Sequence, residues 1–120
     1  MRNTLLAVIG LFLFNLCVLA QMEVVEIEKP QSAKSVAGVV VDPSGAVMGG
    51  VTVEECSEGW KAVLRTTETD DKGRFHFSPT RAKTVYYLEF SRHVFNWVRL
   101  TLQLGKEAKP AITVEMPLGR

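Results

Sequence analysis

The side chains best suited to metal or acid–base chemistry in this 120-residue chain are His76, His93 and Cys56. A metal site needs three or four converging ligands that are held in place by further hydrogen bonds. These three residues could form such a set only if the fold gathered them. Unrelated histidines in a loop or on an exposed strand are the more frequent case. We therefore expect no metal site and no other cofactor.

Residues for catalysis are equally scarce. The acidic run at residues 68–71, Glu-Thr-Asp-Asp, lacks the alternate-residue oxygen spacing of a calcium loop and is typical of a turn. Ser57 has no adjacent base and no nucleophile-elbow motif. Cys56 lies among acidic residues, and their negative charge raises the pKa of a thiol and disfavours the reactive thiolate. The sequence predicts no catalytic residue and a protein that is not an enzyme.

The first 20 residues have the organisation of a secretory signal. Residues 1–3 form a short basic start, residues 5–19 are apolar apart from Asn15, and residues 18–20 offer small or modest side chains to a signal peptidase. We predict a signal peptide at residues 1–20 and a secreted or periplasmic mature protein. The alternative is an uncleaved membrane anchor formed by residues 4–20, and contact with a membrane is expected only in that case.

The mature chain has no overall electrostatic preference. The full sequence has 14 basic and 13 acidic residues, and Arg2 leaves with the signal, so the remaining chain is neutral. Nucleic acid requires clustered Lys and Arg, so we expect no nucleic-acid binding. Cys56 becomes the only cysteine, which excludes an internal disulfide. Stability must therefore come from the hydrophobic core.

Residues 35–54, SVAGVVVDPSGAVMGGVTVE, are predicted to form two β-strands joined by a turn. Residues 36–41 are almost all β-branched, and residues 51–54 alternate between apolar and polar. Between them, Asp42, Pro43 and Gly45 occupy the first, second and fourth positions that a type I turn favours for these residue types. The chain must reverse direction here.

Five more strands are predicted after this pair, at the spacing of roughly 8–12 residues that is typical of an all-β sandwich. They cover residues 62–67, 74–77, 84–91, 97–104 and 111–116, and a turn at residues 70–73 joins the first two. No segment has a sustained helical period. Residues 21–34, which contain Pro30, are predicted to be a linker or N-terminal tether, with an edge strand at residues 24–27 as the alternative.

Alternation along the later strands assigns their side chains to two faces. The side chains expected to face the core are Phe75, Phe77, Tyr86, Leu88, Phe90, Val98, Leu100, Leu102, Leu104, Ile112, Val114 and Met116. The side chains expected to face outward are His76, Val85, Tyr87, Glu89, Trp97, Arg99, Thr101, Gln103 and Glu115.

Three motifs stand out from this pattern: residues 38–45, GVVVDPSG, with GVTV at residues 50–53; residues 69–77, TDDKGRFHF; and residues 87–91, YLEFS, with Phe95. Together they resemble the carboxypeptidase regulatory-like domain. The resemblance implies a prealbumin-like (transthyretin-like), seven-stranded Greek-key β-sandwich over residues 35–117. It also implies a non-catalytic domain that supports folding or contacts partners. Val94 departs from the family pattern, which usually has Gly at this corner.

The remaining candidate site is a set of amphipathic side chains: Trp60, in a loop, and Tyr87, Trp97 and Arg99, on outward-facing strand positions. Exposed aromatic residues with Arg mark interaction surfaces where they cluster, although outward aromatics also serve to cover their own sheet. We predict a non-catalytic exported β-sandwich module that binds or structurally supports a protein partner of unknown identity.

Two other functions remain open. The first is a carbohydrate-binding module in which the exposed aromatics stack on the rings of a glycan. The second is a small transthyretin-like hydrolase. The related 5-hydroxyisourate hydrolases end in Tyr-Arg-Gly-Ser, whereas this chain ends in Met-Pro-Leu-Gly-Arg, which argues against that activity.

Overall fold

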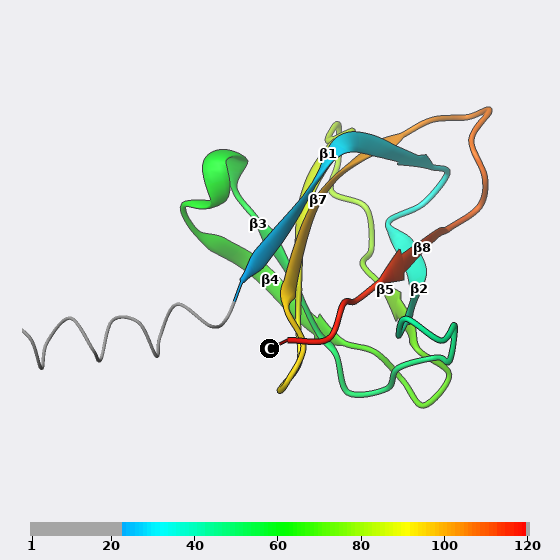
Figure 1. The fold of residues 1–120 in the computed structure, drawn as a ribbon. Helices are drawn as coiled ribbons and strands as arrows, with labels where there is room; N and C mark the ends of the chain where they lie inside the picture. Colours follow the sequence, from blue (N-terminus) through cyan, green and yellow to red (C-terminus); the bar gives the residue numbers. More distant parts are fainter. Residues whose placement is uncertain (1–22, 120) are drawn as a thin grey trace, which may run out of the picture.

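The computed structural model describes residues 23–119, which form two β-sheets packed face to face (Figure 1). The predicted signal peptide and the alternative anchor lie outside the described residues. Within them, no helix is long and apolar enough to cross a membrane. The elements in chain order are β1 (Val24–Ala33), β2 (Ala37–Val41), β3 (Thr52–Cys56), the 3-10 turn η1 (Glu58–Trp60), β4 (Val63–Glu68), β5 (Arg74–His76), β6 (Val85–Ser91), β7 (Trp97–Leu104) and β8 (Ile112–Glu115).

The five-stranded sheet has the order β1-β7-β6-β3-β4, and the three-stranded sheet has the order β5-β2-β8. The seven strands predicted from residue 35 onward are present as β2 to β8. The all-β sandwich is therefore confirmed, but it has eight strands and not seven.

The eighth strand, β1, takes the place of the linker predicted at residues 21–34 and agrees with the alternative of an edge strand at residues 24–27, although it extends further, to Ala33. It runs parallel to β7 and forms the edge of the larger sheet, with Val24 opposite Trp97 and Ala33 opposite Leu104. The pairing is interrupted between Ile27 and Gln31, and this irregularity contains Pro30. Because an edge strand has one unpaired side and a bulge relaxes the ladder, proline is tolerated there. Reading Pro30 as a sign of a linker was therefore wrong.

The core lies between the two sheets and matches the predicted inward faces. Tyr86, Leu88 and Phe90 on β6 are fully buried, and Phe75 of the smaller sheet meets Phe90 of the larger one edge to face, with ring centroids 5.2 Å apart. Complete burial of one such ring stabilises a fold by about 1.5–3 kcal/mol. Leu104 is the exception among the inward residues, since it is only partly buried at the end of β7.

Both predicted turns are held by an aspartate side chain. Asp42 Oδ1 accepts hydrogen bonds from the backbone N–H groups of Ser44 at 2.9 Å and Ala46 at 3.1 Å. Asp70 Oδ1 accepts the N–H groups of Lys72 and Arg74, both at 2.9 Å. These contacts explain the acidic run before β5 as turn chemistry.

The corner after β6 adopts the conformation that usually requires glycine. Val94 has φ +65°, in the left-handed region that a β-branched residue rarely occupies. Val94 therefore stands in place of the usual glycine while its backbone keeps the left-handed conformation that glycine adopts readily. Strain of this kind costs about 1–3 kcal/mol.

Candidate functional site

The outer face of the five-stranded sheet carries a row of charged side chains from four neighbouring strands. The strand pairing aligns Glu54 of β3, Glu89 of β6, Arg99 of β7 and Glu26 of β1. Arg99 Nε donates a hydrogen bond to Glu89 Oε1 at 3.0 Å. Glu89 points outward as predicted, yet it is only 6% exposed, so facing outward does not bring this carboxylate into water.

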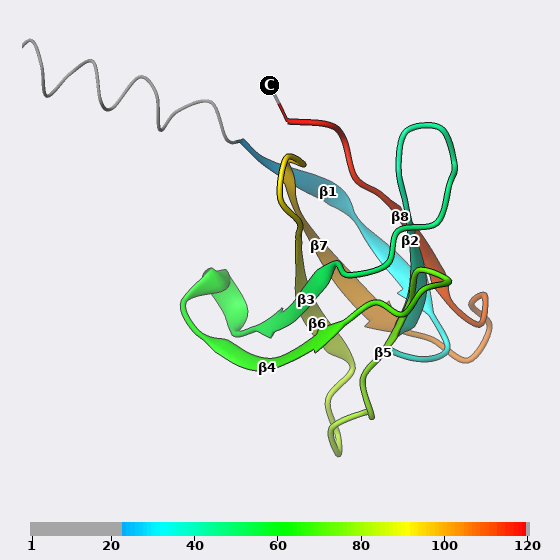
Figure 2. The same ribbon diagram turned by 90° about the horizontal axis from the view of Figure 1, so that it is seen from below.

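The connection between β3 and β4 folds back and places Trp60 beside this row. Gly59 (φ 77°) and Trp60 (φ 62°) both take left-handed backbone conformations in η1, which turns the β3–β4 connection back on itself (Figure 2). The indole of Trp60 then lies against Tyr87, with ring centroids 5.8 Å apart and planes at 78°. The guanidinium of Arg99 lies 5.0 Å from the centre of the Trp60 ring.

Trp60, Tyr87 and Arg99 therefore form one group, which we call the aromatic–arginine cluster. All three side chains are partly buried, and Trp60 contacts both Tyr87 and Arg99. An edge-to-face aromatic pair and a cation–π contact each contribute about 0.5–1.5 kcal/mol. The sequence predicted these residues as a set. It could not show that Trp60, in a loop, contacts Tyr87 on β6 and Arg99 on β7, because that contact depends on the path of the loop.

Trp97, the fourth predicted residue, lies apart from the cluster. It projects from the same face of β7 two residues before Arg99, is 41% exposed, and pairs with Val24 of β1. Among the described residues, none forms an aromatic or cation–π contact with Trp97. The structure thus divides the predicted site into a half-buried cluster and one exposed tryptophan near the first described strand, β1.

A second charged group, which the sequence did not reveal, lies on the inner face. Glu55 of β3 sits opposite Leu88 of β6 and is 1% exposed. Its Oε1 accepts a hydrogen bond from Arg65 Nε at 2.7 Å, and its Oε2 is paired with Lys83 Nζ. Burial raises the pKa of the Glu55 carboxyl, but the hydrogen bonds and charges of Lys83 and Arg65 outweigh burial and hold the pKa below its usual value.

The residues considered for metal or nucleophilic chemistry do not meet. His76 is exposed on β5, and His93 is exposed in the β6–β7 connection. Within residues 23–119, no group of three or more His, Cys, Asp or Glu side chains could hold a metal ion. Cys56 is buried, and burial together with the charges of Glu89 and Glu54 raises the pKa of its thiol. These features give the described chain no assembled catalytic group.

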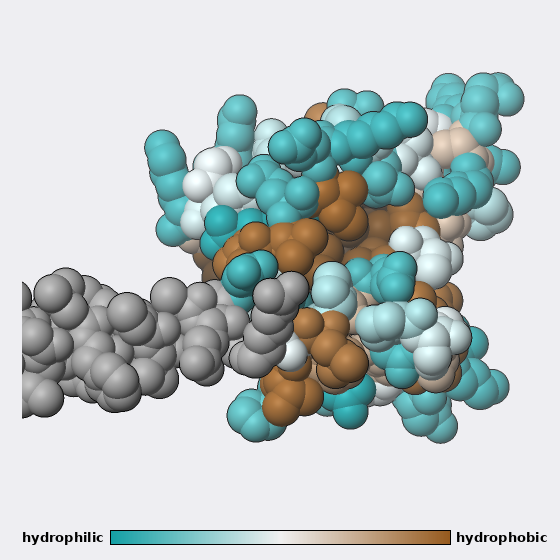
Figure 3. All heavy atoms as spheres, in the orientation of Figure 1, coloured by the Kyte–Doolittle hydropathy of each residue, from teal (hydrophilic) through white to brown (hydrophobic). Residues whose placement is uncertain are grey.

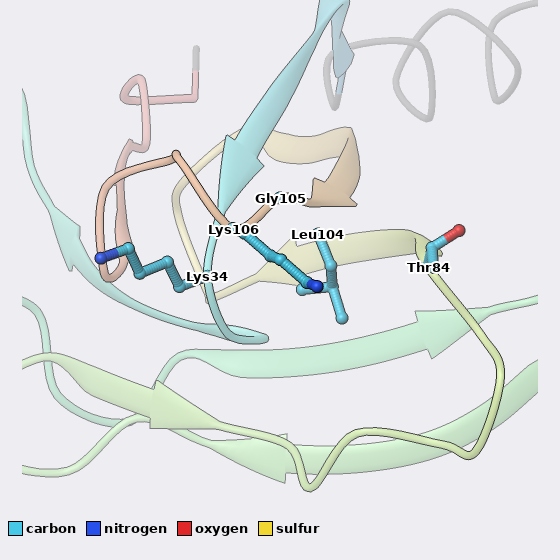
Figure 4. A pocket seen from close by; sticks show the side chains of 5 residues that line it. All are labelled: Lys34, Thr84, Leu104, Gly105 and Lys106. Atoms are coloured by element: carbon cyan, nitrogen blue, oxygen red, sulfur yellow. The ribbon is translucent and has the colours of Figure 1, made fainter.

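A shallow depression of about 500 Å³ opens at the end of the sandwich where β1 leads into β2 and β7 leads into β8. Its lining consists of Lys34, Thr84, Leu104, Gly105 and Lys106 (Figure 4). Figure 4 shows the Lys34 and Lys106 side chains extending in different directions, so their ammonium groups do not converge on one point. The depression therefore lacks the convergent polar groups of a ligand pocket.

Two β-sheets packed face to face around a filled core define a β-sandwich module of the prealbumin-like type. The family model of the carboxypeptidase regulatory-like domain matches residues 35–117, and the chain belongs to this family. The match begins after β1, so this strand is an addition to the seven that the family model spans. No curated protein matches the chain closely enough to indicate a relative.

Proposed function

We propose that this protein is a non-catalytic, exported β-sandwich module that binds a protein partner through the outer face of its five-stranded sheet. The observation that carries the proposal is the aromatic–arginine cluster, in which Trp60 holds Tyr87 and Arg99 together on an otherwise polar face. Tyr, Trp and Arg are the residues that most often dominate the binding energy of protein interfaces.

The cluster is already organised before any partner binds. Arg99 is fixed by Glu89 on one side and by the Trp60 ring on another, while its side chain remains 30% exposed. A guanidinium has five N–H donors, and the bond to Glu89 uses only the Nε donor. The terminal N–H groups are thus available to a carboxylate or carbonyl of a partner, with little loss of side-chain entropy on binding.

A carbohydrate function has weaker support. Stacking on a sugar needs an aromatic ring with an open face, whereas the Trp60 ring is contacted by Arg99 and by the edge-to-face ring of Tyr87. Trp97, which is 41% exposed, stands apart from these two rings and offers a single stacking surface. The hydrolase alternative loses support for a similar reason, because His76 and His93 lie in separate parts of the sandwich and have no shared site.

Affinity capture tests the protein-partner proposal. Residues 21–120 are immobilised and exposed to the envelope and secreted fractions of the source organism, alongside Tyr87→Ala and Val47→Ala variants. Val47 is 52% exposed in the β2–β3 connection, outside the five-stranded sheet, and so provides a loss of exposed apolar surface away from the cluster. We expect one protein to be retained by the wild type and by Val47→Ala but lost with Tyr87→Ala. Equal retention by all three would remove the cluster as the binding site, and thermal unfolding would confirm that both variants fold.

A further inference from the structure

Four of the seven large hydrophobic side chains that are exposed in the described chain gather at one end of the sandwich. They are Val24 (46% exposed), Val94 (55%), Trp97 (41%) and Leu118 (60%), and we call this group the terminal tip. In Figures 1 and 2 the start of β1, the β6–β7 connection and the C-terminal segment lie together at this end. Figure 3 shows hydrophobic surface over the same segments.

Backbone contacts hold the terminal tip together. Trp97 N–H donates to the carbonyl of Glu23 at 3.1 Å, and Gly119 N–H donates to the carbonyl of Val94 at 2.8 Å. Phe95 forms a β-bridge with Leu118. The exposed apolar side chains are therefore part of a defined surface that includes both ends of the described chain.

Val94 adds a sign that this surface has a function. Its backbone is strained at φ +65°, and its side chain is more than half exposed, so folding gains little from placing valine there. Glycine would relieve the strain and remove the exposed apolar group. Residues kept in such conformations cluster at binding surfaces, because their cost is balanced by function and not by stability.

The sequence places a strongly apolar segment directly before this surface. Residues 4–20 are almost entirely apolar, and only residues 21–23 separate them from Val24. Three residues extend the chain by about 10 Å at most. If residues 4–20 remain attached and lie in a bilayer, the terminal tip must therefore lie at the level of the lipid headgroups.

We propose that the terminal tip is a membrane-contact surface that rests in the headgroup region while residues 4–20 anchor the chain. The chemistry of the tip suits this position. Trp97 has an apolar ring with a polar N–H, which favours the membrane interface. Arg92 stacks on Phe95 with 5.9 Å between guanidinium and ring centre, and so presents a cation to lipid phosphates. The inference takes up the alternative to the predicted signal peptide, in which residues 4–20 remain attached as an anchor, and it is independent of the protein-partner proposal.

The two tryptophans of the chain provide the test, because Trp97 belongs to the tip and Trp60 to the cluster. The full chain is reconstituted in vesicles of phosphatidylcholine and phosphatidylglycerol, with and without bromine-labelled acyl chains that quench tryptophan on contact. A Trp60→Phe variant reports Trp97 alone, and a Trp97→Phe variant reports Trp60 alone. We expect bromolipid to quench Trp97 several-fold more strongly than Trp60, and we expect added Val94→Ser and Leu118→Ser substitutions to reduce the quenching of Trp97.

Three results would overturn the proposal. Equal quenching of both tryptophans, or stronger quenching of Trp60, would show that the tip does not face the lipid. A concentration-dependent blue shift of Trp97 that persists without lipid in residues 21–120 would indicate that a second copy covers the tip. Native protein that begins at Gln21 by intact-mass measurement would show that no anchor holds the tip at a bilayer.

Discussion

Glu55 and Glu89 lie on neighbouring strands of the five-stranded sheet, and both are almost inaccessible to water, but they face opposite sides. Glu55 points into the core beside Leu88, and Glu89 points outward in the row with Arg99. Glu55 is paired with two cations, Arg65 and Lys83, whereas Glu89 is paired with one. The two sites therefore differ in how burial arises and in how the charge is compensated.

The difference in orientation and in the number of cationic partners indicates that the stability of the fold depends more on Glu55 than on Glu89. A carboxylate on the inner face has no route to water except through its partners, and Arg65 extends this contact by donating to the Ser78 carbonyl at 2.7 Å and lying 4.9 Å from the Phe77 ring centre. Glu89 has a single cationic partner, Arg99, which lies against Trp60 of the β3–β4 connection. If that connection moves, we expect water to reach the carboxylate. We expect Glu55 to matter for folding and Glu89 to matter for the shape of the outer face.

The largest effect is expected when both cations of Glu55 are removed. An Arg65→Met/Lys83→Met variant keeps most of the side-chain length but leaves the carboxylate uncompensated in the core. Loss of partners around a buried charge costs about 3–5 kcal/mol. Urea unfolding at neutral pH should show a loss of this size. Adding Glu55→Gln to the same variant should restore part of it, and a failure to do so would mean that the lost packing of Arg65 and Lys83, not the charge, caused the change.

Removing the partner of Glu89 should cost less. In Arg99→Met the carboxylate can be hydrated after a small movement of the β3–β4 connection, so we expect a loss of about 1–2 kcal/mol, within the range for a hydrogen bond to a charged group. The same urea measurement gives the comparison. A loss as large as that of Arg65→Met/Lys83→Met would show that the connection is rigid and that the two sites are equivalent.

Glu55 and Glu89 also show which structural features the sequence predicts and which it does not. Period-two alternation correctly placed Glu89 on the outer face and Phe75, Leu88 and Val98 in the core, because side-chain direction along a strand is a local property. Burial is not local. Whether an outward residue meets water depends on the loops and side chains that lie over it, and the left-handed turn at Gly59 and Trp60, which brings Trp60 against Arg99, has no periodic signal.

Glu55 was missed, and β1 was predicted only as the alternative to a linker. Glu55 lies just beyond the strand predicted at residues 51–54, and although alternation after Val53 points it inward, nothing in the sequence shows that Arg65 and Lys83 meet it there. The strand β1 was obscured by Pro30, although its pairing with β7 allows proline at the irregularity. For the candidate site, residue type selected Trp60, Tyr87, Trp97 and Arg99, but only the fold separates Trp97 from the other three.

Acid unfolding distinguishes Glu55 in a second way. Because the pKa of folded Glu55 lies below its usual value of 4.5, the group contributes stability that is present above that pH and is lost as pH falls through the folded pKa. The stability of Glu55→Gln should therefore depend less steeply on pH below 4.5 than that of the wild type. Turn hydrogen bonds, led by that from the Ser44 side chain to Asp42 and that from the Arg74 backbone to Asp70, lower the pKa of these carboxyls as well, so a smaller slope should remain. Unchanged pH dependence in thermal unfolding curves would contradict this role.

The smallest change in stability, but a clear change in chemistry, is expected from Trp60→Ala. Cys56 lies on the outer face opposite Tyr87 and is 3% exposed, next to the surface that Trp60 covers. Removing a half-exposed ring should cost about 1 kcal/mol, since only part of its apolar area is buried. The thiol, however, should become accessible and react faster with a thiol reagent at fixed mildly alkaline pH, measured on residues 21–120 so that Cys17 does not contribute. Val47→Ala, which removes exposed apolar surface in the β2–β3 connection, serves as the control and should leave the rate unchanged. If Trp60→Ala also leaves it unchanged, the strands themselves bury Cys56.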